Sequence, residues 1–122
     1  MGNLKNLEKS LYTCWKNNLK GFGVKFPSGT KLNELICLYD NLHTPLSQDD
    51  IEKWFKEYDL EYKRQARHLA DFGWDIRSGN SRFTRGMQEK SLKRNQLVLF
   101  SVTLPNPIWN KDNKKRLNNL SE

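Results

Sequence analysis

The sequence lacks any long apolar run, and this absence excludes a membrane-spanning helix. No stretch approaches the roughly eighteen consecutive apolar residues that a span needs. The first residues, Met1 to Lys5, also lack the apolar segment of a secretory signal. We therefore expect a cytoplasmic protein that does not contact a membrane.

Residues that build disulfide or metal frameworks are equally scarce. The only two cysteines, Cys14 and Cys37, lie among apolar neighbours without a Cys-x-x-Cys spacing, which favours reduced, buried thiols. The only two histidines, His43 and His68, are too far apart in the sequence to indicate a metal or nucleophile site. We expect no metal and no cofactor. No catalytic motif occurs, so the sequence leaves open whether the chain belongs to an enzyme.

Positive charge is what the chain has in excess, and it is unevenly placed. The 122 residues are 36% hydrophobic and 29% charged, as expected of one small globular domain, and the net charge is +7. Residues 1–60 carry eight lysines and eight acids, whereas residues 61–94 carry nine Lys and Arg against four acids. Such a cationic strip is typical of proteins that bind a polyanion. The alternative is a basic surface that only aids solubility.

Hydrophobic spacing predicts two helices in the first third of the chain. The first is expected over residues 3–20, with Gly21 as its C-terminal stop. The second opens at residues 28–30 and is broken at residues 42–45, which end in a proline. Each helix carries a single apolar stripe, so each is expected to cover one side of a core.

A third helix has the clearest start signal in the sequence. Ser47 is placed as its N-cap, and Asp50 three residues later completes a short-armed capping box. Leu46 and Ile51 flank that cap at the positions of a hydrophobic staple. We therefore expect the helix to begin immediately after Ser47.

A fourth helix is expected over residues 61–72, ending at a left-handed Gly73. The pattern then changes to strands over 74–77 and 96–104, separated by a basic loop. Helix, helix, short turn, helix, strand, loop and strand is the order of a winged helix, a mainly α fold with a small β-hairpin.

Three segments follow from this order. Residues 1–27 are a helical extension, residues 28–104 are the winged-helix DNA-binding domain, and residues 105–122 are a polar tail or linker. In such a fold the helix at 60–72 enters the major groove, while the wing at 77–95 follows the backbone or the minor groove.

The cationic and amide side chains of these two segments are the expected DNA contacts. Arginine can bind guanine as a fork, glutamine can pair with adenine, and lysine suits phosphate. The expected DNA-binding residues are Lys63, Arg64, Gln65, Arg67, His68, Arg77, Arg82, Arg85, Lys93 and Arg94, with Lys90 as a further cation of the wing.

The run from Tyr62 to Ile76 resembles a motif of one family. Its Arg-x-x-Arg-x-Leu, followed by Gly-Trp-x-Ile, is similar to small winged-helix domains attached to HNH-type restriction endonucleases. Residues 91–99 resemble the strand that closes the wing there. The resemblance implies a module that reads double-stranded DNA, in some members sensing base methylation, while a separate covalently linked domain cuts. It implies that Arg64 and Arg67 contact DNA.

Two other functions fit the same sequence. A small winged-helix transcriptional regulator would normally dimerise to read two half-sites. A protein-interaction winged helix would instead present its basic face to an acidic partner.

Overall fold

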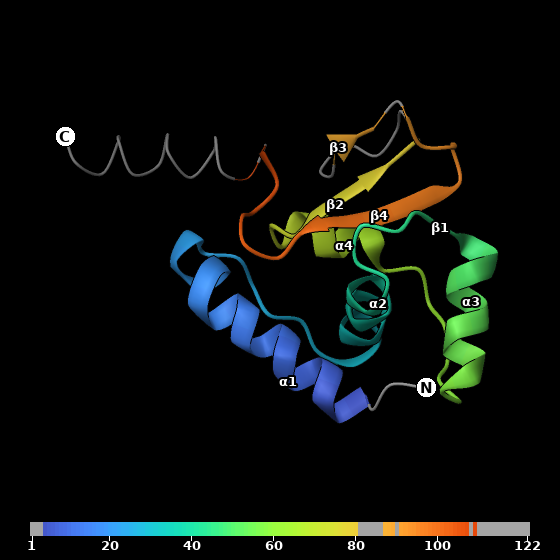
Figure 1. Ribbon diagram of the computed structural model, residues 1–122, viewed down its shortest axis with the longest axis horizontal. Helices are drawn as coiled ribbons and strands as arrows, with labels where there is room; N and C mark the ends of the chain where they lie inside the picture. Colours follow the sequence, from blue (N-terminus) through green and yellow to red (C-terminus); the bar gives the residue numbers. More distant parts are fainter. Residues whose placement is uncertain (1–3, 81–86, 90, 108, 110–122) are drawn as a thin grey trace.

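The computed structural model describes residues 4–80, 87–89, 91–107 and 109 (Figure 1). The fold is mainly helical with a small sheet, as the sequence predicts. Helix α2 lies between α1 and α3, and the sheet lies beside α4 (Figure 1). None of the helices in these ranges is long and apolar enough to cross a membrane.

The first helix continues past the predicted stop. Helix α1 spans Leu4–Cys14 and continues as a π-helical segment, Trp15–Leu19, and a 3₁₀ turn, Lys20–Phe22. The prediction that Gly21 ends it is wrong, because Gly23 has the left-handed conformation, with φ of 83°. The buried Leu19 and half-buried Phe22 keep the winding chain on the core, so the stop falls after them.

The N-terminal extension is part of the main core. Leu11, Leu19 and Val24 belong to the same buried cluster as the later helices and the sheet. Lys25 is held on both sides: its N–H donates to Phe72 O at 3.1 Å, and its carbonyl accepts from Trp74 Nε1 at 2.9 Å. Residues 1–27 therefore help to position the segments that follow.

Helices α2 and α3 form where the apolar spacing predicts them. Helix α2 spans Gly29–Asp40 and buries Leu35 to Leu38 together with Glu34. The two-residue strand β1, Leu46–Ser47, leads into α3, Gln48–Glu57. The capping box is confirmed: Ser47 Oγ accepts from Asp50 N at 3.2 Å, and Asp50 Oδ2 accepts from Ser47 N at 2.9 Å. This hydrogen bonding lowers the pKa of Asp50.

Helix α4 is much shorter than predicted. It spans Ala66–Asp71, whereas residues 61–65 are not helical, so the prediction of a helix over 61–72 is wrong for its first half. The reason is tertiary, because the buried Glu34 accepts the N–H of Gln65 at 2.6 Å, at the N-cap of α4. Five predicted DNA-contact residues are thus split between a loop, with Lys63, Arg64 and Gln65, and a helix, with Arg67 and His68.

The end of α4 follows the prediction. Gly73 is left-handed, with φ of 108°, and its N–H donates to Ala70 O at 3.0 Å. The N–H of Trp74 donates to Leu69 O at 3.3 Å, which completes the Schellman pattern of hydrogen bonds. Leu69 and Trp74 are both fully buried in the core.

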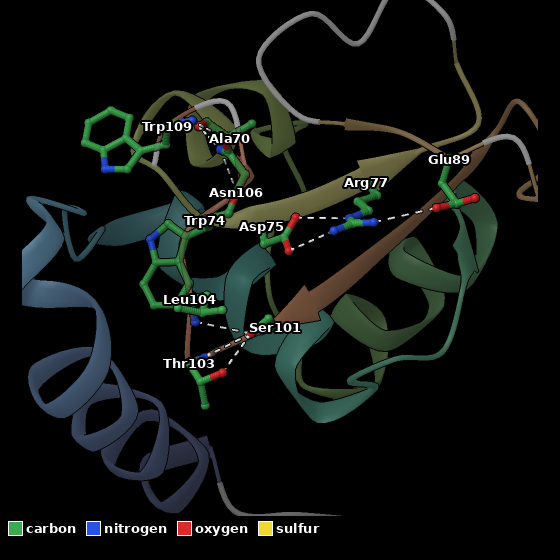
Figure 2. Close-up of polar contacts among 10 residues, drawn as sticks. All are labelled: Ala70, Trp74, Asp75, Arg77, Glu89, Ser101, Thr103, Leu104, Asn106 and Trp109. Carbon is green, nitrogen blue, oxygen red and sulfur yellow. Dashed lines mark hydrogen bonds and ion pairs between the residues drawn. The ribbon is translucent and has the colours of Figure 1, made fainter. Parts of the chain in front are cut away.

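Strands β2, Asp75–Ser78, and β4, Gln96–Ser101, pair antiparallel, as predicted. The sheet order is β1-β4-β2-β3: β1 adds an antiparallel edge to β4, and β3, Met87–Gln88, pairs parallel with β2. Strand β4 ends three residues before the predicted Leu104. The cause is Ser101 Oγ, which accepts the N–H groups of Thr103 and Leu104 and bends the chain (Figure 2).

The polar tail is predicted to begin at residue 105, but the chain is still packed on the fold there. Asn106 is buried, and its side-chain amide donates to Ala70 O and Trp74 O at 3.3 and 3.4 Å (Figure 2). Its Oδ1 accepts from Trp109 N at 2.7 Å, and Trp109 Nε1 donates to Phe22 O at 3.1 Å. Pro105, Asn106 and Trp109 are therefore packed on the body, while residues 108 and 110–122 lie outside the described residues.

We expect Gly73→Ala to destabilise the fold by about 2 to 4 kcal/mol, because strain and overpacking add. A Cβ at residue 73 would lie 2.8 Å from Val24 Cγ2 and 3.0 Å from the Trp109 ring, at a positive φ. Gly21→Ala is the matched control, since a Cβ there meets nothing within 4 Å. Urea denaturation of both variants checks this, and equal midpoints would contradict it.

Candidate nucleic-acid interface

A cleft of about 620 Å³ opens between α4, the loop at residues 61–65, the start of α3 and the β2–β4 hairpin, and Glu34 of α2 also lines it. Residues from these five elements meet there. Its lining residues are Glu34, Gln48, Ile51, Tyr62, Arg64, Ala66, Arg67, His68, Ser78, Asn80, Arg94, Asn95 and Leu97.

Burial divides this lining into a floor and a rim. Glu34, Ile51, Ala66 and Ser78 are buried and form the floor. The exposed rim carries the cations Arg64, Arg67 and Arg94, together with His68 and Asn95. The cleft thus has a cationic opening above a mostly uncharged floor, which suits an anionic ligand.

The structure brings together four of the ten predicted DNA-contact residues. Arg64 comes from the loop before α4, Arg67 and His68 from α4, and Arg94 from the turn before β4. Of the remaining predicted contacts, Lys63 and Lys93 are exposed but do not line the cleft, and Gln65 is half-buried with its N–H bound to Glu34. Arg82, Arg85 and the further cation Lys90 lie outside the described residues.

Arg77 occupies a different environment from the other predicted contacts. Its Nε lies 3.2 Å from Asp75 Oδ1, and its Nη1 lies 3.6 Å from Glu89 Oε2 (Figure 2). Its guanidinium stacks 3.7 Å from the centre of the Phe100 ring. Burial raises the pKa of Asp75, and the neighbouring Arg77 opposes that rise. Arg77 therefore joins strands β2 and β4 and does not line the cleft.

The close approach of the two arms of the hairpin depends on Gly79. A Cβ on this residue would lie 2.2 Å from Lys93 O and 2.5 Å from Leu92 O, both of them backbone atoms. Only glycine therefore allows the chain leaving β2 to pass the chain entering β4 at this distance. This crossing places Asn80 and Arg94 on the same cleft. The sequence pattern predicts only a loop at residue 79.

Glu34 is the residue that sequence reasoning missed. It is fully buried, and its Oε2 accepts the N–H of Gln65 at 2.6 Å. Its Oε1 has no hydrogen-bond partner among the described residues. Burial raises the pKa of Glu34 to about 7, opposed by the Gln65 hydrogen bond and by the positive charge of Arg64. An acid beside an apolar stripe usually faces water, so the sequence pattern contains no sign of this burial.

The carboxyl of Glu34 also influences its neighbours. Burial, reinforced by Glu34, raises the pKa of Tyr62 to about 12 and raises the pKa of Cys37. Both cysteines are free thiols, Cys37 being buried and Cys14 partly so. Among the described residues, no group of three His, Cys, Asp or Glu side chains is placed to hold a metal ion.

Comparisons with protein-family models, with curated protein sequences and with solved structures returned no significant match to this chain.

The raised pKa of Glu34 predicts a pH dependence of stability. The pKa of Glu34 is about 7 in the folded chain, against 4.5 for an ordinary glutamate, so the folded chain holds this proton more tightly than the unfolded chain. The resulting stabilisation is complete below pH 4.5 and is lost as the pH rises through about 7. The loss is about 3 kcal/mol, from the size of the shift. We expect Glu34→Gln to remove this dependence, as measured by urea denaturation at several pH values.

The control for that experiment is Glu57→Gln, which changes an exposed acid at the end of α3. This variant should keep the pH dependence of the original protein. Parallel stability curves for the original protein and Glu34→Gln, at every pH, would contradict the assignment of the effect to Glu34.

Proposed function

We propose that this chain is a winged-helix module that recognises double-stranded DNA, of the kind attached to restriction endonucleases. The order α2, β1, α3, α4, β2 and β4, with β2 and β4 as the hairpin, supports a winged-helix arrangement. The additional parallel strand β3 and the helical N-terminal extension would be elaborations of it.

The observation that carries the proposal is the convergence of cations. The cations Arg64, Arg67 and Arg94 come from a loop, a helix and a turn that are up to thirty residues apart, yet they share one cleft rim, together with His68. Side chains that only aid solubility have no reason to gather in this way, because like charges repel each other. A polyanion that releases its counterions on binding would stabilise the arrangement.

The fold also supports a division of roles. Arg67 and His68 are exposed on α4, the helix that would face the major groove and its base edges. Arg64 and Arg94 lie on either side of α4, on the preceding loop and on the hairpin, where they would meet the sugar–phosphate backbone. The short length of α4 would limit direct readout to few bases.

Two alternative functions remain candidates for the same arrangement. A transcriptional regulator of this fold would dimerise on DNA, so a single sedimenting species of monomer mass, with and without DNA, would count against it. A protein-interaction module would bind an acidic partner, and failure to bind any duplex at low salt would favour it.

Removing the rim charges should weaken DNA binding. We expect Arg64→Gln with Arg67→Gln to lower affinity for a duplex by on the order of tenfold or more per contact to a base, and to reduce the slope of log affinity against log salt by about 1 per contact to phosphate. Fluorescence polarisation over a salt series measures both quantities.

The matched control removes the same charge elsewhere. Lys9→Gln with Lys16→Gln changes two exposed cations in the N-terminal helical region, outside the cleft lining. This pair should retain most of the affinity. If both double variants lose affinity equally, the cleft is not the DNA-binding surface.

The resemblance to restriction-enzyme modules further predicts discrimination of base methylation. We expect duplex pools carrying N6-methyladenine or 5-methylcytosine to bind with an affinity different from that of the unmodified pool at moderate salt. Fluorescence polarisation against the three pools checks this. Equal affinities for modified and unmodified copies of a selected site would overturn this part of the proposal.

A further inference from the structure

The floor of the cleft contains a buried acid whose hydrogen bonding is incomplete. Glu34 Oε2 accepts the N–H of Gln65, while Oε1 has no donor among the described residues. Buried polar atoms are nearly always paired, because leaving one without a partner costs about 1 to 3 kcal/mol. A donor supplied by a ligand would explain why an acid, rather than a shorter apolar residue, occupies this floor.

The rim limits what that ligand is. Three arginines, Arg64, Arg67 and Arg94, surround the opening, so the ligand carries negative charge, and arginine is well suited to phosphate. Tyr62 lines the cleft and is half-buried, and its ring packs on Phe55 with centroids 5.0 Å apart. It offers an aromatic edge or face to a planar group. The ligand therefore combines an anionic group, a planar ring and a hydrogen-bond donor, and a nucleotide has all three.

The depth of Glu34 separates a paired base from an unpaired one. The edge of a paired base stays at the surface of the duplex, where exposed side chains read it. Glu34 has no exposed surface and lies below the rim. A base therefore has to leave its stack to reach this carboxyl, and the cleft volume of about 620 Å³ is within the range of small-molecule sites.

We propose that the cleft binds one unpaired nucleotide, with its phosphate on the rim arginines and the exocyclic amino group of its base hydrogen-bonded to the carboxyl of Glu34. The amino groups of adenine, cytosine and guanine are such donors. Because the carboxyl is fully buried, a side chain has to turn aside before a base can reach it. Arg64, which lies close enough to Glu34 to stabilise its charge, can do so by turning onto the phosphate.

This inference rests on the proposed function if the nucleotide is part of DNA, whereas a free nucleotide is the other source of the same chemistry.

The experiment uses the full chain at about pH 8.5, where the carboxyl of Glu34, with a pKa of about 7, is ionised and can only accept hydrogen bonds. Three labelled duplexes of one sequence are compared by fluorescence polarisation. One is fully paired, one has a single unpaired adenine, and one has unpaired purine, which lacks the amino group.

We expect the unpaired adenine to bind about tenfold or more tightly than unpaired purine, as for one hydrogen bond to a charged group. Glu34→Gln preserves the acceptor for Gln65 and replaces the free acceptor with a donor, so it should abolish the difference. Glu57→Gln should preserve it. The comparison of bases on the unaltered protein tests the inference even if Glu34→Gln does not fold.

The remaining outcomes are distinct from one another. Equal affinity for all three duplexes would overturn the unpaired-nucleotide site and leave DNA binding intact. If no duplex binds at low salt, the proposed function fails, and direct calorimetric titration of the chain with free AMP and with purine riboside monophosphate decides the inference. A preference for AMP would support a free nucleotide as the ligand, and no preference would overturn the site.

Discussion

The hydrogen bond from the Gln65 N–H to the carboxyl of Glu34 determines where α4 begins. It joins the middle of α2 to the chain just before α4, and it ends the irregular segment at residues 61–65. Because of this contact, Arg64 lies on a loop and Arg67 on a helix, and both face one cleft. A continuous helix over the same residues would place them three apart on one exposed face. The geometry of the cationic rim therefore depends on a buried acid.

The other end of α4 is held just as firmly. Gly73 takes the left-handed conformation and leaves no room for a side chain beside Val24 and Trp109. Asn106 donates to Ala70 and Trp74 on the two sides of that glycine and also holds the N–H of Trp109 (Figure 2). A helix of six residues is too short to be stable alone, so its two ends have to be fixed by tertiary contacts. These contacts at both ends hold the short helix α4 in place between the hairpin and α3.

Much of the fold is predictable from local chemistry. The capping box of Ser47 and Asp50, the glycine stop at residue 73 and the antiparallel pairing of β2 with β4 all depend on residues close in sequence or on a strong apolar pattern. Part of the candidate site is predictable for the same reason, since the arginines lie in a conspicuous cationic strip. The role of Arg77 is not, because its partners Glu89 and Phe100 lie on other strands or turns of the hairpin region.

The sequence by itself determined the mainly helical class, the order of the four helices and the two hairpin strands, and the concentration of positive charge after residue 60, because periodicity, caps and composition are local properties. Only the tertiary structure decided the length of α4, the docking of Asn106 and Trp109, and the meeting of Arg64, Arg67 and Arg94 above Glu34. Each of these depends on contacts between residues some thirty or more positions apart, such as Glu34 with Gln65 and Trp109 with Phe22. Such contacts form only when the helices and the sheet pack on a common core, so they leave no periodic signal in the sequence.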